Sequence, residues 1–177
     1  RELIAAVEAD RPTLFIGTIA PLPDSGRPTG MFKHPVSAAL QLGFEGFSGD
    51  EQADRRVHGG PEKAVHLYPA THYARLAERF PDAADQLQPG SLGENISSPT
   101  LDETQVRIGD IFQLGEARLQ LCQPRSPCWK IDDRFGVERP VEQRARRGER
   151  AIAARADAHD AGFRLGHVAG AGQHQQQ

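Results

Sequence analysis

The chain has 177 residues, 38% of them hydrophobic and 25% charged, and this composition favours one domain with one hydrophobic core. A formal net charge of −3 without a dominant basic patch excludes a nucleic acid polymer as an expected partner. No apolar run reaches the length of a membrane span and no signal peptide is recognisable, so we expect no membrane association and a cytoplasmic location.

The first third of the chain alternates between short apolar runs and turn residues. Residues 13–20 are β-branched and apolar up to a proline, which predicts a strand. Residues 24–30 have turn chemistry, and residues 31–42 predict one or two further strands. The glycine- and charge-rich segment 43–64 shows little periodicity, which predicts a long irregular stretch of the kind that often carries function.

A helix is predicted over residues 70–80, with Thr71 as its N-cap and Pro81 as its end. Its apolar residues recur at helical spacing, namely Tyr73, Leu76, Ala77 and Phe80. His72 in this helix is interpreted as an ordinary surface histidine, and residues 82–88 as a further short helical turn.

A hairpin is predicted from two strand-like stretches, 106–115 and 116–125, that meet near Gly115. Ala117, Leu119 and Leu121 share one face of the second strand. Cys122 lies on the other face and is interpreted as a packing residue. Many short strands with one clear helix predict a mainly β protein with some α structure, in the form of a barrel or sandwich whose loops carry the site.

Residues 137–177 differ from residues 1–136 because they are rich in alanine, arginine and glutamine and poor in large apolar residues. We therefore predict a division into a domain over 1–136 and an atypical tail over 137–177. The tail is expected to be partly disordered, with a helix around 138–157.

The segment VHGGPEKAVHLY, residues 57–68, is the first candidate for a ligand site. The backbone amides of Gly59 and Gly60 can approach an anion closely, and Lys63 adds a positive charge beside them. His58 and His66 can donate hydrogen bonds to an oxyanion or bind a metal. A solvated glycine turn with two bystander histidines explains the same pattern.

Two further loops carry polar groups. The stretch PGSLGENISS places Glu94 and Asn95 directly after Gly93, although an ordinary capped loop is also consistent with it. The stretch QPRSPCWKID places Cys128 between Arg125 and Lys130, and such cations favour a reactive thiolate. A disulfide between Cys122 and Cys128 is disfavoured in a reducing compartment.

The strings GDEQADRRVHGGPEKAVHLYP, GSLGENIS and IGDIFQLGEARLQLCQPRSPCWKID, in this order, resemble the MOSC domain, the C-terminal domain of molybdenum cofactor sulfurases. The likeness covers about residues 12–136 and is to stand-alone bacterial members of the YiiM type. It implies a compact, mainly β domain with a barrel-like core and few helices that binds molybdenum cofactor, the molybdopterin form of molybdenum.

The resemblance also implies roles for individual residues. Cys128 is expected to be the molybdenum ligand and the catalytic residue. The cofactor-binding residues implied by the two loops and by the cations around them are Lys33, His58, Gly59, Gly60, Lys63, His66, Gly93, Glu94, Asn95, Arg125 and Lys130.

The implied activity is the reduction of N-hydroxylated small molecules of the hydroxylaminopurine type, with electrons from a separate reductase. An alternative is a cysteine-based sulfur carrier or cofactor-delivery protein, and a third is a non-catalytic remnant. A homodimer is compatible with the sequence. The tail does not resemble the strand-forming sequence that the family has after the cysteine, and we interpret this as a shift of reading frame near residues 137–142.

Overall fold

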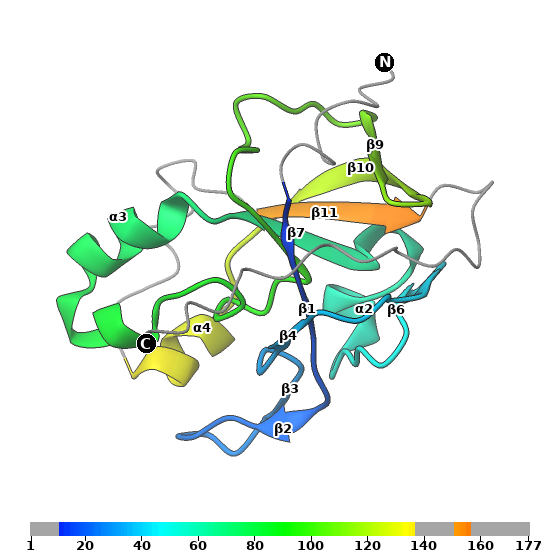
Figure 1. Ribbon diagram of the computed structural model, residues 1–177. Helices are drawn as coiled ribbons and strands as arrows, with labels where there is room; N and C mark the ends of the chain where they lie inside the picture. The colour runs from blue at the N-terminus through cyan, green and yellow to red at the C-terminus, as the bar shows by residue number, and fades with distance from the viewer. Residues whose placement is uncertain (1–10, 137–150, 157–177) are drawn as a thin grey trace, which may run out of the picture.

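The computed structural model describes residues 11–136 and 151–156, and its main feature is a seven-stranded mixed sheet (Figure 1). Only β7 and β8 are parallel neighbours, and all other neighbouring strands are antiparallel. In spatial order the strands are β4 (His34–Val36), β1 (Thr13–Ile16), β8 (Ile96–Ser98), β7 (Val65–Pro69), β11 (Ala151–Ala156), β10 (Ala117–Arg125) and β9 (Ile111–Leu114).

The predicted α+β class is confirmed, because a few short helices accompany a sheet whose neighbouring strands are mostly antiparallel. The expected barrel is not closed in the described part of the chain, since the edge strands β4 and β9 do not pair with each other. The fold is therefore an open, mixed sheet with its loops and helices at the ends of the strands.

The strand predicted over 13–20 is divided by Gly17. A Cβ atom at this position would lie 2.3 Å from the carbonyl oxygen of Phe32, so the two backbones meet too closely for any side chain. Strand β1 ends at Ile16, and the chain continues into a small hairpin of β2 (Ala20–Pro21) and β3 (Pro28–Thr29). The turn chemistry predicted over 24–30 falls in this hairpin.

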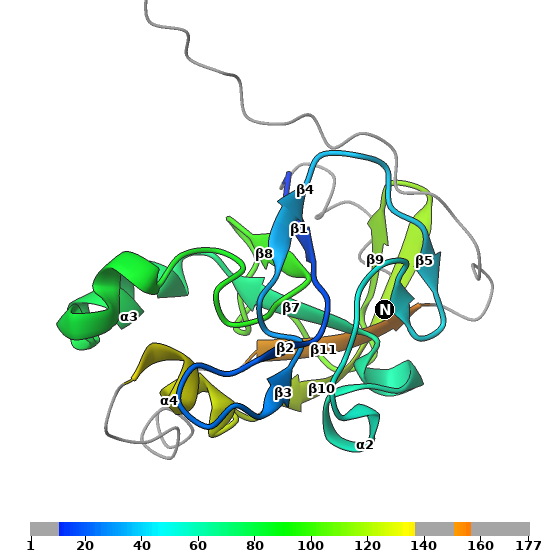
Figure 2. The ribbon, with the colours of Figure 1, turned by 90° about the horizontal axis from the view of Figure 1, so that it is seen from below.

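The segment predicted to be irregular contains only short elements. It begins with a hairpin of two short strands, β5 (Leu42–Gly43) and β6 (Gly46–Phe47). Helix α2 (Arg55–His58) and the 3₁₀ helix η1 (Pro61–Lys63) follow. Asp54 caps α2, because its side chain accepts a hydrogen bond from the backbone N–H of Arg56. Helix α2 lies on the same side of the molecule as the β2–β3 hairpin (Figure 2).

The predicted helix is α3 (His72–Arg79), followed by the 3₁₀ helix η2 (Pro81–Gln86), and both extend from the end of β7. Together with α4 (Lys130–Phe135), which the sequence analysis did not predict, they form a small apolar cluster beside the sheet (Figure 1). Its buried members are Tyr68, Tyr73, Leu76, Ala83, Leu87, Leu92 and Phe135.

The interpretation of His72 as a surface residue is wrong. Its side chain is buried and its Nε2 atom lies 3.2 Å from Oε2 of Glu103. Helical spacing places His72 beside the apolar face of α3, where Tyr68 packs edge-on against the imidazole ring. A partner distant in sequence thus made burial of this polar side chain favourable.

The predicted hairpin is confirmed as β9 and β10, which turn at Gly115 with Leu114 opposite Ala117. Ala117, Leu119 and Leu121 are buried as expected. The register of β10 shifts between Leu121 and Gln123, so Cys122 lies at an irregularity of the strand and is half-buried.

Part of the predicted tail belongs to the main sheet. Residues 151–156 form β11, which lies between β7 and β10, so the helix expected around 138–157 is wrong for these residues. Pairing with two flanking strands here outweighs the helix propensity of an alanine-rich sequence. The rest of that helix, the reading-frame hypothesis and most of the tail fall on 137–150 and 157–177, outside the described residues.

The main hydrophobic core lies on one face of the sheet and includes side chains from five of its strands, from the β5–β6 hairpin and from neighbouring loops. Its buried members are Leu14, Leu40, Leu42, Phe47, Ala64, Val65, Leu67, Ile96, Leu101, Phe112, Leu114, Ala117, Leu119 and Leu121. Among the described residues, no helix has both the length and the apolar character needed to cross a bilayer.

Replacement of Leu119 by alanine should lower the free energy of unfolding by about 2–5 kcal/mol, because Leu119 is only 3% exposed and its loss leaves a cavity. Ile108→Ala is the matched control, since Ile108 is 68% exposed, and its effect should stay within about 0.5 kcal/mol. Urea denaturation of the two variants measures both values, and equal effects would contradict the assigned core.

Candidate functional site

One pocket collects most of the residues that the sequence singled out. It is bounded by the β2–β3 hairpin, the 50–54 loop, α2, β7 and the segment from Arg125 to α4. Nine of the twelve predicted site residues line it, namely Lys33, His58, Lys63, His66, Gly93, Asn95, Arg125, Cys128 and Lys130. Gly59, Gly60 and Glu94 do not.

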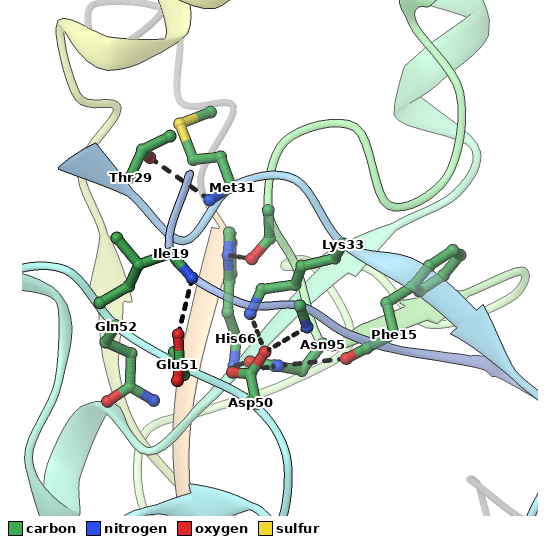
Figure 3. Close-up of polar contacts among 12 residues, drawn as sticks. Phe15, Ile19, Thr29, Met31, Lys33, Asp50, Glu51, Gln52, His66 and Asn95 are labelled. Carbon is green, nitrogen blue, oxygen red and sulfur yellow. Dashed lines mark hydrogen bonds and ion pairs between the residues drawn. The ribbon is translucent and has the colours of Figure 1, made fainter. Parts of the chain in front are cut away.

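A buried ion pair between Lys33 and Asp50 forms one wall of the pocket (Figure 3). The two side chains are 4% and 1% exposed, respectively. Burial lowers the pKa of Lys33, and the charge of Asp50 opposes this effect. The positive charge expected from Lys33 is therefore already balanced within the protein.

Asp50 and Asn95 are hydrogen-bonded to each other and to the backbone at β1 and β7 (Figure 3). Asp50 accepts hydrogen bonds from the backbone N–H of Gly17 at 3.0 Å and from Nδ2 of Asn95 at 2.9 Å. The same Nδ2 atom donates to the carbonyl oxygen of Phe15 at 3.2 Å, while Oδ1 of Asn95 accepts from the backbone N–H of His66 at 3.1 Å. Asn95 thus fixes β7 and β1 at the edge of the pocket.

Glu94 has a different environment from its neighbours. It is fully buried, and its Oε1 atom accepts hydrogen bonds from the hydroxyl of Tyr73 at 2.6 Å and from the N–H of Gly90 at 2.7 Å. Burial raises the pKa of Glu94 and also that of Tyr73. In this structure the carboxyl group stabilises the 88–94 loop and does not contact the pocket.

Gly93 and Gly59 lie where another part of the chain comes too close to leave room for a side chain. Gly93 has a φ of +79°, and a Cβ atom there would lie 3.1 Å from Cα of Met31. A Cβ atom on Gly59 would lie 3.0 Å from Cα of Arg55, so the chain leaves α2 close to the backbone of that helix. Gly59 and Gly60 thereby let the chain turn from α2 into η1 with Lys63 beside the pocket.

Three cations of the pocket differ from Lys33, because no carboxylate pairs with them within the described ranges. Lys63 donates to the carbonyl oxygen of Val57 at 2.9 Å, and Lys130 donates to that of Pro28 at 2.8 Å. The guanidinium of Arg125 is largely buried, and burial lowers its pKa while the nearby Cys128 raises it. A buried cation with this environment favours an anionic ligand.

His58 and His66 line the pocket as neutral imidazoles. Burial and the positive charge of Arg125 lower the pKa of His58 to about 4. The same two causes hold the pKa of His66 well below its usual range. Both side chains are therefore uncharged at neutral pH and interact with a ligand only through hydrogen bonds or as metal ligands.

Cys128 is a half-buried thiol in the pocket wall, whereas Cys122 lies outside the pocket, and the two form no disulfide. The described residues contain no group of three or more His, Cys, Asp or Glu side chains that could hold a metal ion by themselves. A metal at Cys128 would therefore take most of its ligands from a bound cofactor or from solvent.

Several pocket residues were not predicted from the sequence, above all Asp50, together with Thr29, Met31, Gln52, Tyr68 and Ile131. Asp50 stands in a charged, glycine-rich stretch, where an acidic residue is usually solvated. Only its long-range contacts with Lys33 and Asn95 distinguish it, and no local pattern indicates those contacts.

Comparison with known proteins places this pocket in a family context. The family model described as the MOSC domain matches residues 54–170, which include β11 and much of the segment after residue 136. Protein YiiM of Escherichia coli is 42% identical over 124 residues, which are 70% of this chain and 55% of that protein. A protein named Reductase from Gibberella moniliformis is 38% identical over 121 residues, 68% of this chain and 21% of that protein.

The crystal structure of YiiM from E. coli aligns with 88% of this chain and 65% of that chain, with a TM-score of 0.67 and 29% identity. The chain spans about half the length of the curated YiiM protein that it matches.

Replacement of Asp50 by asparagine should lower the free energy of unfolding by about 3–5 kcal/mol, because it leaves the buried ammonium of Lys33 without a counter-charge. The double variant with Lys33→Met removes that ammonium and should recover at least half of the loss. Chemical denaturation of the two single variants and the double variant measures the coupling. Additive losses would contradict the ion pair.

Stability should fall as the pH falls from about 6.5 to about 4, because unfolded His58 takes up a proton in this range while folded His58 stays neutral. The fall between pH 7 and pH 4.5 should be smaller in His58→Gln by about 1 kcal/mol, after allowance for solvent screening. His34→Gln removes an exposed histidine and should retain the wild-type fall. Denaturation at both pH values tests this, and identical behaviour of the two variants would contradict it.

Proposed function

The chain belongs to the MOSC domain family, and on this premise we propose that it binds molybdenum cofactor in the pocket and reduces N-hydroxylated small molecules with it. The observation that carries the proposal is the presence of a free thiol and a buried guanidinium in one pocket. Cys128 can supply a thiolate to a metal, and Arg125 lacks a carboxylate partner in the described part of the chain.

The donor set of the pocket suits this cofactor. The described residues offer no complete metal site, which fits a metal that is held mainly by its own organic ligand and receives one protein thiolate. Arg125, Lys63 and Lys130 suit a phosphate group, while Lys33 is neutralised by Asp50. The neutral His58 and His66 suit polar edges of a pterin or of the substrate.

The proposed reaction takes two electrons and two protons. An N-hydroxylated amine, R–NH–OH, becomes R–NH₂ and water, with cleavage of the N–O bond. When bound, the cofactor would supply the two-electron exchange, and the chain would supply binding, orientation and electrostatics. The electrons would come from a separate reductase. The relative named Reductase supports a redox role.

A sulfur carrier or cofactor-delivery protein is the alternative, and the half-buried position of Cys128 in an open pocket also fits a cysteine persulfide. The cations around the pocket favour a cofactor-binding protein over a sulfur carrier, because a persulfide needs no phosphate-binding residues. A homodimer and a cytoplasmic location stay predictions.

Replacement of Cys128 by alanine should abolish molybdenum retention, because it removes the thiolate that we assign to the metal. Protein reconstituted with molybdenum cofactor and measured by elemental analysis should hold about one metal per wild-type chain. Cys122→Ala is the matched control and should retain the wild-type amount, because Cys122 does not line the pocket.

Equal loss of metal in the two variants would contradict the assignment of Cys128. Turnover of a hydroxylamino substrate with an artificial electron donor distinguishes the enzyme from the carrier. Retained cofactor without turnover, together with a persulfide on Cys128 in mass spectrometry, would favour the carrier.

A further inference from the structure

The hydrogen-bond partner of His58 determines which of its nitrogens carries the proton. Nη2 of Arg125 lies 3.3 Å from Nδ1 of His58. A guanidinium can only donate, so Nδ1 of a neutral His58 must accept and Nε2 must carry the hydrogen. His58 is part of the pocket wall and therefore offers an N–H donor to a ligand.

His66 has the opposite arrangement. Its Nδ1 atom lies 3.3 Å from the carbonyl oxygen of Gly93, which can only accept, so Nδ1 carries the hydrogen. Its Nε2 atom then has a bare lone pair. This atom is buried and has no hydrogen-bond partner in the part of the chain that the structure describes. A buried polar atom without a partner is uncommon and points to a ligand that satisfies it.

We propose that the two imidazoles recognise a ligand by its hydrogen-bonding groups. His58 donates to an acceptor oxygen of the ligand, and His66 accepts from an N–H or O–H group. Both residues line the same pocket and interact electrostatically with each other. A ligand that fits carries an oxygen acceptor and a proton donor on one polar edge. A ligand with acceptors alone satisfies His58 and leaves His66 unpaired.

This polarity selects a class of ligand. An N-hydroxylated amine and the amide edge of a pterin each combine an acceptor oxygen with an N–H or O–H donor, whereas a carboxylate or sulfate ion has acceptors only. The identity of the ligand rests on the proposed function. The tautomers of the two histidines do not, because Arg125 and Gly93 fix them in the protein alone.

Nitrogen-15 NMR of histidine-labelled protein without cofactor tests the tautomers directly at pH 7. Wild-type protein should show the Nε2–H form for His58 and the Nδ1–H form for His66, with the signals assigned from His58→Gln and His66→Gln. Arg125→Met should give a mixture of tautomers at His58 and leave His66 unchanged. An Nδ1–H form of wild-type His58, or no response to Arg125→Met, would overturn the inference.

Sulfate is the probe for the donor role, because it is fully deprotonated at pH 7 and has acceptor oxygens only. Its addition should shift the Nε2–H signal of His58 and leave the His66 signals in place. His58→Phe should weaken sulfate binding about tenfold, the loss expected for one hydrogen bond to a charged group, while His66→Phe should change it less than twofold. An unaltered His58 signal, or equal losses in the two variants, would overturn the donor role.

The result stays distinguishable from a failure of the proposed function. Protein that shows the expected tautomers and sulfate response but never retains molybdenum supports the polarity of the pocket and counts against the cofactor. Protein that retains molybdenum on Cys128 but shows the wrong tautomers supports the cofactor and counts against the polarity of the pocket.

Discussion

The buried carboxylate of Asp50 is the constraint on which the pocket depends. It joins the end of β1 at Gly17, the side chain of Lys33 before β4, and Asn95 before β8. Three segments far apart in sequence meet at one charge, and that charge is stable in the interior only because all three partners are present. Asn95 carries the same constraint on to the backbone of β7, where His66 lies.

This pairing also decides which cations of the pocket can act on a ligand. Lys33 and Asp50 neutralise each other, so the positive field in the pocket comes from Arg125 and from the more exposed Lys63 and Lys130. Residues of the same formal charge therefore have different roles. The guanidinium of Arg125, which no carboxylate of the described residues pairs, also lies near Cys128, and an anionic cofactor bound there would supply the missing negative charge.

Motifs in the sequence indicated which segments meet at the pocket, but not the contacts within it. The HGG, GEN and SPC strings each contribute residues to one pocket, and the β9–β10 hairpin follows from alternation and a turn glycine. Local patterns did not predict the burial of His72 or the turn of Glu94 toward Tyr73, because each depends on a partner far away in the chain. Helix propensity gave the wrong structure for 151–156, where two flanking strands determine the conformation.

The position of β11 has a consequence for how the protein is made. The strands β7 and β10 carry His66 and Arg125, and in the sheet these residues lie opposite Ala153 and Ala151 of β11. The ribosome synthesises β7 and β10 before β11. During synthesis these two strands therefore lack the strand that lies between them in the folded sheet. The two strand edges stay unsatisfied over that interval and are open to wrong pairing. β7 and β10, which carry these two pocket residues, can be joined through the sheet only after β11 has been synthesised.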